Sequence, residues 1–82
     1  MHYQIEFVAK ARDQLRALPK DVRRLIGVKL DHVQHDLTGD IKKLKGFKNK
    51  YRLRAGNYRV LFELEGACLV VYDVGDRKDI YE

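Results

Sequence analysis

The hydrophobic pattern of this chain changes its period twice, and these changes limit the fold more than any other feature. Residues 3–7 alternate apolar and polar side chains, as a half-buried strand does. Residues 8–37 instead repeat apolar side chains at helical spacing, and the alternation returns in residues 51–74. The pattern therefore predicts a strand, a helical region and then further strands, which together make an α+β domain.

A single proline divides the helical region. Pro19 follows Leu18, and the first helix is expected to end there because proline disfavours helical backbone in the residue before it. Pro19 itself suits the first turn of a second helix. We expect this second helix to end at Thr38-Gly39-Asp40, where the glycine suits a C-terminal cap. Two helices joined so tightly are expected to form an antiparallel hairpin.

The C-terminal half of the chain reads as three strands joined by tight turns. Gly56-Asn57 separates two alternating segments and is a typical signal of a two-residue hairpin. Glu65-Gly66 marks a second tight turn, and Gly75 is expected to end the third strand. We therefore expect a three-stranded antiparallel meander that forms one sheet with the N-terminal strand, with the helices packed on one face. Residues 1–82 are long enough for one such domain.

Positive charge is concentrated in one segment of the chain. The formal net charge is +5, yet the stretch between Ile41 and Phe62 holds eight basic residues and no acidic one. These residues are Lys42, Lys43, Lys45, Lys48, Lys50, Arg52, Arg54 and Arg59. Such asymmetry favours a polyanionic partner, with nucleic acid as the first hypothesis. For the lysines alone, a solvated loop and an RNA-binding groove are both consistent with the sequence.

The expected hairpin brings two arginines together. If Gly56 and Asn57 form the turn, Arg54 lies directly opposite Arg59, and Arg52 is on the same face. Like charges opposite each other destabilise a sheet by up to about 1 kcal/mol, so this arrangement favours an anion site. A phosphate is the best candidate because the guanidinium group can bind it through two hydrogen bonds. The alternative is a solvated face whose arginines pair with nearby carboxylates.

The last eight residues carry further chemistry, including Asp76, Arg77 and Tyr81. A terminal tyrosine can stack on an exposed base, an interaction worth about 1–3 kcal/mol in single-stranded recognition. Ordinary packing that holds down the chain end is the alternative for Tyr81.

The remaining reactive side chains suggest no metal or cofactor. Cys68 lies in an apolar run and is interpreted as a buried small side chain. His32 and His35 can share one helix face, but no acidic or cysteine ligands are arranged around them, which favours a surface role. The apolar stretches are far shorter than the roughly 18 residues of a membrane span, and the N-terminus lacks a secretion signal. We expect a cytoplasmic protein.

Three segments resemble the RelE branch of the RelE/ParE toxin superfamily. Residues 43–46 read Lys-Leu-Lys-Gly, residues 51–62 read Tyr-Arg-Leu-Arg-Ala-Gly-Asn-Tyr-Arg-Val-Leu-Phe, and residues 74–81 read Val-Gly-Asp-Arg-Lys-Asp-Ile-Tyr. With the order of elements, the resemblance extends from the N-terminal strand to Tyr81. It implies a RelE-like fold and a type II toxin–antitoxin toxin that cuts messenger RNA in the ribosomal A site and inhibits translation.

The resemblance also implies a reaction and a set of site residues. The RNA 2′-hydroxyl would attack the adjacent phosphate and expel the 5′-oxygen. Arg52 and Arg54 match basic residues of the family's active face, and Arg59 and Arg77 match its phosphate-binding, transition-state-stabilising arginines. Tyr81 matches a C-terminal tyrosine that stacks on or orients the nucleotide. Arginines that stabilise developing phosphoryl charge need no metal, and Lys43, Lys45, Lys48 and Lys50 would add RNA binding.

Two departures from the family concern proton transfer. Arg52 and Arg54 stand where some relatives have lysine, and arginine stays protonated in proteins, so neither suits a general base. Gly75-Asp76-Arg77 stands where many relatives read Gly-His-Arg. Asp76 is therefore a candidate general base, and a salt bridge to Arg77 is its alternative role.

Two other functions are consistent with the sequence. A toxin of the ParE kind shares the fold and binds DNA gyrase without cutting RNA, and a plain RNA-binding module would carry no chemistry. The expected partners are the ribosome, messenger RNA and a cognate antitoxin with an acidic or amphipathic inhibitory segment. DNA would be contacted only indirectly, through the antitoxin.

Overall fold

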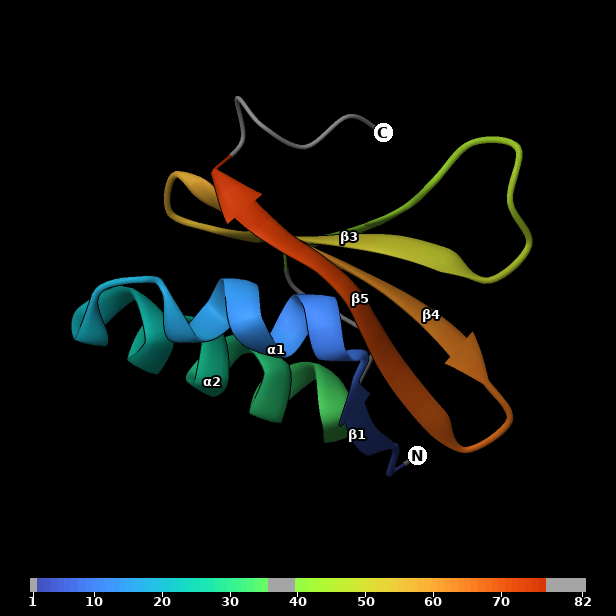
Figure 1. Cartoon of the computed structure of the whole chain (residues 1–82). Coiled ribbons are helices and arrows are strands. Elements are labelled where there is room, and N and C mark those ends of the chain that lie inside the picture. The colour runs from blue at the N-terminus through green and yellow to red at the C-terminus, as the bar shows by residue number, and fades with distance from the viewer. Residues whose placement is uncertain (1, 36–39, 77–82) are drawn as a thin grey trace.

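A computed structural model describes residues 2–35 and 40–76 of the chain. Five strands form one sheet in the order β1-β5-β4-β3-β2, and two helices lie antiparallel to each other across one face of it (Figure 1). The elements are β1 (Gln4–Phe7), α1 (Ala9–Arg16), α2 (Lys20–His35), β2 (Ile41–Lys43), β3 (Lys50–Ala55), β4 (Tyr58–Glu65) and β5 (Cys68–Asp76). The α+β class, the helical hairpin and the C-terminal meander are confirmed.

The sheet differs from the prediction in three details. It contains an additional edge strand, β2, which pairs antiparallel with β3. The sequence does not reveal this strand because two of its three residues are lysines, a composition common on protected edge strands. The N-terminal strand β1 runs parallel to β5, so the sheet is mixed. Strand β5 also continues through Gly75, the residue predicted to end it, as far as Asp76.

The turn between β3 and β4 has the predicted register. Gly56 has φ +61°, a backbone conformation that favours glycine, and it occupies the first turn position, as type II′ hairpins require. Ala55 pairs with Tyr58, and Arg54 pairs with Arg59. The prediction that two arginines face each other across this hairpin is therefore confirmed.

The two helices are separated close to the predicted position. Helix α1 ends at Arg16, and the Leu18 N–H still donates to the Leu15 carbonyl at 3.1 Å. The Arg23 N–H donates to the Pro19 carbonyl at 3.0 Å, so Pro19 contributes to the first turn of the second helix as expected. Helix α2 is described to His35, and the predicted C-terminal cap includes positions 38 and 39, which lie outside the described residues.

The main core lies between the helices and the sheet. Helix α2 contributes three buried apolar side chains, and the rings of Tyr51 and Phe62 stack with centroids 5.4 Å apart. Its largest fully buried members are Phe62, Ile26, Leu53, Leu69, Val33, Val60 and Val71. These contacts hold β3, β4 and β5 rigidly, and these strands support the side chains on the opposite face of the sheet.

A bulge in β5 sends one aromatic side chain to the other face. Leu61 pairs with Asp73 and Phe62 with Val71, so Tyr72 is an extra residue in the ladder. Tyr72 packs against Leu61 and Leu44 in a second, smaller apolar cluster. The sheet face opposite the helices therefore carries an apolar cluster of its own among its charged residues.

Candidate functional site

The sheet face turned away from α1 and α2, called the open face below, carries the predicted site residues of the hairpin. Side chains alternate along a strand, and Leu53 and Ala55 of β3 are buried in the core. Lys50, Arg52 and Arg54 therefore project from the open face. On β4 they lie opposite Glu63, Leu61 and Arg59, respectively.

Arg54 and Arg59 form a cationic pair at the turn end of the open face. Arg54 is exposed, and Arg59 is half-buried and lies between Arg54 on β3 and Gly75 on β5. Gly75 has no side chain, so β5 adds no bulk beside Arg59 at this position. Because Val60 next to Arg59 is fully buried, the backbone beneath the pair is held by the core. This register would allow the two guanidinium groups to bind one phosphate above a backbone that the core holds in place.

Strand β2 adds a basic residue that the sequence analysis left out of the site. Lys42 lies directly opposite Arg52 in the ladder, which places it on the open face. Lys43 lies opposite Tyr51, whose ring packs on the core side, so the predicted RNA-binding Lys43 belongs to the other face of this edge strand. The sequence marks Lys42 only by its charge. The sheet face on which Lys42 lies depends on strand β2, which the sequence did not predict.

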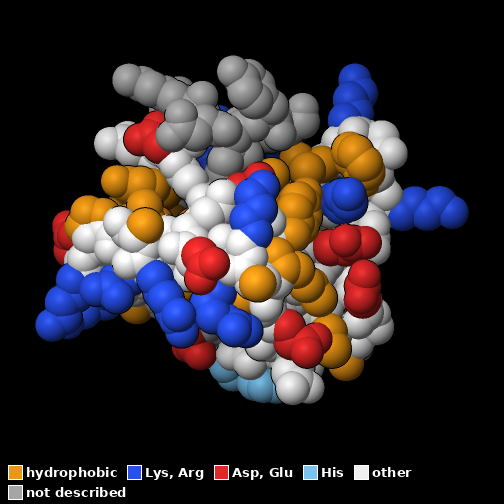
Figure 2. Space-filling view, in the orientation of Figure 1, with side chains coloured by type: hydrophobic (Ala, Val, Ile, Leu, Met, Phe, Trp, Pro, Cys, Tyr) orange, Lys and Arg blue, Asp and Glu red, His pale blue; other side chains and the backbone are white. Residues whose placement is uncertain are grey.

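The lysine-rich loop between β2 and β3 is closed by hydrogen bonds. The Leu44 N–H donates to the Lys50 carbonyl at 2.8 Å, and the Asn49 side chain donates to Glu63 and to the Leu64 carbonyl. Lys45 and Lys48 are exposed on this loop. Figure 2 shows basic side chains projecting beside exposed hydrophobic ones on the right of the view, where Figure 1 places this loop.

Asp76 ends β5, one residue beyond the position that pairs with Arg59. Asp76 pairs with Tyr58. Val74, two residues earlier on the same strand and therefore on the same face of the sheet as Asp76, is buried in the core. The pairing therefore directs Asp76 towards the face that the helices cover. Arg77 and Tyr81, the two other predicted site residues of the C-terminus, lie outside the described residues.

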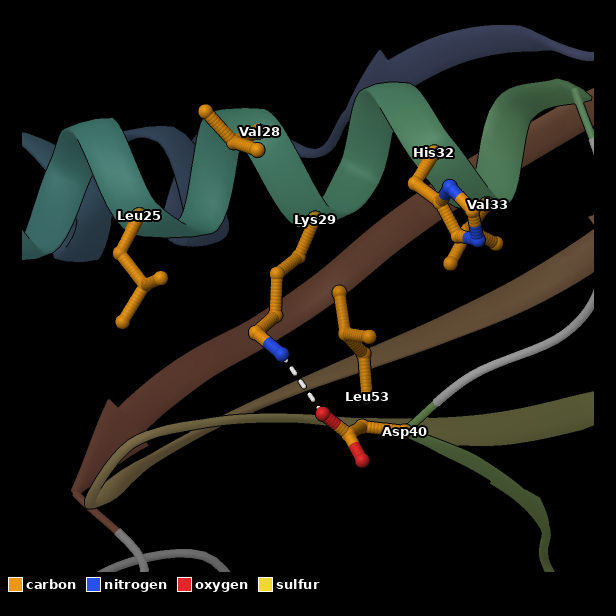
Figure 3. A pocket seen from close by; sticks show the side chains of 7 residues that line it. All are labelled: Leu25, Val28, Lys29, His32, Val33, Asp40 and Leu53. Atoms are coloured by element: carbon orange, nitrogen blue, oxygen red, sulfur yellow. Dashed lines mark hydrogen bonds and ion pairs between the residues drawn. The ribbon is translucent and has the colours of Figure 1, made fainter.

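A groove between α2 and β3 is a feature that the sequence analysis missed. It has a volume of about 360 Å³ and is lined by Leu25, Val28, Lys29, His32, Val33, Asp40 and Leu53 (Figure 3). The Lys29 ammonium donates to Asp40 at 2.6 Å across its mouth. This hydrogen bond and the attraction of Lys29 and Arg54 hold the pKa of Asp40 below its usual value.

Further side chains with reactive or titratable groups lie outside the arginine pair. Cys68 is half-buried rather than buried, because it begins β5 at the end of the sheet, and a hydrogen bond with Glu6 raises the pKa of its thiol. Burial, with Glu63 and Asp73 nearby, raises the pKa of Tyr72. His35 contacts the His2 ring with centroids 4.8 Å apart, and His32 lines the α2–β3 groove.

Within residues 2–35 and 40–76, no group of three metal-ligating side chains occurs. No helix in that part of the chain is long and apolar enough to cross a membrane.

Comparison with known proteins gives consistent relatives. No protein-family model matches the chain. The chain is 38% identical over 73 residues to Toxin RelE3 of Methanocaldococcus jannaschii, with 83% of each chain covered. Its fold matches the RelB–RelE antitoxin–toxin complex from Methanococcus jannaschii with a TM-score of 0.79 and 34% identity, covering 93% of this chain and 94% of that chain. The intact Escherichia coli RelBE complex matches with a TM-score of 0.78 and 26% identity, over 90% of this chain and 95% of that chain.

Proposed function

This chain belongs to the RelE family of toxins from type II toxin–antitoxin systems, and we propose that it is an endoribonuclease that cuts messenger RNA on the ribosome. The observation that carries this proposal is the Arg54–Arg59 pair, which the hairpin register places on the open face. Two guanidinium groups opposite each other suit the charge of an RNA phosphate, whereas binding to a protein alone gives no reason for them.

The pair can stabilise the charge that develops during cleavage. Attack of the RNA 2′-hydroxyl on the adjacent phosphate forms the new phosphorus–oxygen bond and breaks the bond to the 5′-oxygen. The products are a 2′,3′-cyclic phosphate and a 5′-hydroxyl, because the 2′-oxygen loses one proton and the 5′-oxygen takes one up. Negative charge grows on the phosphoryl oxygens, and donors already oriented by a rigid strand pair stabilise it without reorganisation. We propose that Arg77 and Tyr81 complete this site, with Arg77 on the phosphate and Tyr81 on the nucleotide. None of these steps requires a metal.

The proton of the 2′-hydroxyl has no obvious acceptor among the arginines. Arginine remains protonated in proteins, and the sheet pairing directs Asp76 away from the pair. We therefore propose that positioning of the message on the ribosome supplies a large share of the rate enhancement. Correct orientation of the attacking oxygen can contribute several orders of magnitude, so a weak base is compatible with activity.

The same surface suggests how the toxin is held inactive. The relatives from Methanococcus jannaschii and Escherichia coli were solved as RelB–RelE complexes. We propose that a cognate antitoxin binds this chain and that an acidic or amphipathic segment of it covers the open face, whose Lys42, Arg52 and Arg54 would attract it. The proposed site of action is the cytoplasm, where ribosomes and messages are found.

The Arg59→Ala variant tests the proposal. Programmed ribosomes with an end-labelled message should be cut by the wild-type protein, and the variant should cut about 100- to 1000-fold more slowly, as expected for loss of one preorganised donor. Val28→Ala is the matched control, because Val28 is exposed on α2, on the other side of the sheet.

Two results would contradict the proposal. Cleavage by Arg59→Ala at the wild-type rate would show that the site lies elsewhere. Induced expression without antitoxin that damages DNA and leaves messages intact would instead support a toxin that binds DNA gyrase.

A further inference from the structure

An aromatic ring stands exposed at the loop end of the open face. Phe47 leaves 47% of its surface accessible, although it is one of the largest apolar side chains in the molecule. The Lys50 ammonium lies 4.7 Å from the centroid of its ring and 5.3 Å from that of Tyr72. One cation thus contacts two aromatic side chains that come from different parts of the chain.

The backbone around this ring is held in place. The Phe47 N–H donates to the Leu44 carbonyl at 3.4 Å, and Leu44 is buried against Leu61 and Tyr72. Gly46 has φ +87°, which fixes the tight bend just before Phe47. The ring is therefore presented by an ordered loop.

Packing within the fold does not account for this exposure. Phe47 belongs to neither apolar cluster of the structure. A cation–π contact with the half-buried Lys50 is a modest stabilisation and leaves about half of the ring in water. An exposed aromatic among basic residues is, however, the arrangement by which proteins bind single-stranded nucleic acid, through base stacking and backbone attraction.

We propose that Phe47, together with Tyr72 and Lys50, forms a stacking platform for a nucleobase of the bound RNA. This inference rests on the proposed function, since it names a further contact of the same substrate. The charge around the platform is mainly basic. Glu63 lies opposite Lys50, but the loop and the open face also carry Lys42, Lys45, Lys48 and Arg52, and this excess of positive charge favours a polyanionic ligand. When a base stacks on Phe47, the Lys50 ammonium moves to the RNA backbone.

The platform and the arginine pair contact different nucleotides. Lys50 and Arg54 are four residues apart on one strand, which corresponds to about 13 Å at a rise of about 3.3 Å per residue. Nucleotides stacked as in a helix rise about 3.4 Å each, so this distance spans about four of them. The platform therefore holds a base that flanks the phosphate at Arg59, and its role is to position the message.

The test uses single-stranded RNA that carries 2-aminopurine, a fluorescent base quenched by stacking, and 2′-O-methyl riboses that prevent cleavage. We expect binding of the wild-type protein to quench the fluorescence. Phe47→Tyr should preserve the quenching, whereas Phe47→Leu should abolish it and weaken binding about 5- to 100-fold. Lys48→Gln is the charge control, and it should weaken binding and reduce its salt dependence but keep the quenching.

Undiminished quenching and affinity in Phe47→Leu would overturn the inference. So would a Phe47→Leu protein that binds RNA normally but loses affinity for its antitoxin, because the ring would then be a protein contact. Failure of the proposed function looks different. In that case the wild-type protein would leave messages uncut on ribosomes, whatever the 2-aminopurine signal.

Discussion

Among single residues, the two arginines of the β3–β4 hairpin are placed where they lower the stability of the fold. Arg54 and Arg59 face each other across an antiparallel ladder, where like charges destabilise the sheet. Uncharged or oppositely charged side chains would suit a solvated face better. A phosphate bound between the two guanidinium groups, as proposed, would offset their mutual repulsion.

Arg54→Thr is predicted to separate stability from activity. Removing one of two opposed charges should raise the free energy of unfolding by a few tenths to about 1 kcal/mol, because threonine also suits a strand and the attraction of Arg54 to the exposed Asp40 is weaker than its repulsion from Arg59. The same change should slow message cleavage about 100-fold. Urea unfolding and ribosome-dependent cleavage are the two measurements. Arg23→Ala, which removes an exposed charge from α2, should leave cleavage unchanged, and a less stable Arg54→Thr protein would refute the argument.

Asp76→Asn is predicted to retain cleavage within tenfold of the wild-type rate. The reason is the pairing of Asp76 with Tyr58, which directs it away from Arg59. The rate should be measured over a range of pH on programmed ribosomes. A loss of 100-fold or more, with the acid limb of the pH profile removed, would establish Asp76 as the general base.

At the scale of elements, the site depends on how β2 and α2 are fixed beside β3. The Asp40 carbonyl accepts a hydrogen bond from the Arg54 N–H at 2.8 Å, and the Asp40 side chain accepts one from Lys29 of α2 at 2.6 Å. Asp40 therefore connects the helix, the start of β2 and the strand that carries Arg54. Its lowered pKa reflects this position.

This contact predicts a dependence of stability on acid. The pKa of Asp40 is lower in the folded protein than its ordinary value of 3.8, so its contribution is present above that pH and is lost as the pH falls through the folded-state value. Asp40→Asn should lower the urea midpoint slightly at pH 7, and the difference from wild type should disappear in strong acid. Asp31→Asn, on the exposed side of α2, is the charge-matched control. An equal deficit at both pH values would show that the ion pair is not responsible.

The sequence predicts elements well where local chemistry decides them. The helical hairpin follows from apolar spacing around Pro19, and the opposition of Arg54 and Arg59 follows from Gly56-Asn57, because a two-residue turn fixes the register of every residue in the hairpin. Strand β2 could not be predicted, since its lysines have no apolar alternation and its pairing with β3 is a tertiary contact. The bulge at Tyr72 and the sheet face on which Asp76 lies also depend on the pairing of β5 with β4, which the local sequence does not specify.

At the scale of the whole molecule, the two faces of the sheet have different tasks. One face packs against α1 and α2 (Figure 1) and supplies the core. The open face carries arginines, lysines and a small apolar cluster. The net charge of +5 is therefore concentrated where RNA is proposed to bind, which favours rapid, salt-sensitive association with ribosomes and messages. A basic surface of this kind also favours an antitoxin that brings negative charge.

In the proposed reaction, the open face promotes attack by the message's own 2′-hydroxyl. The most direct measurement uses programmed ribosomes carrying either an all-ribose message or one with a single 2′-deoxyribose on the 5′ side of the scissile phosphate. We predict that the ribose message is cut to a product ending in a 2′,3′-cyclic phosphate and that the deoxyribose message is not cut at that phosphate. Cleavage of the deoxyribose message there at a comparable rate would contradict the account.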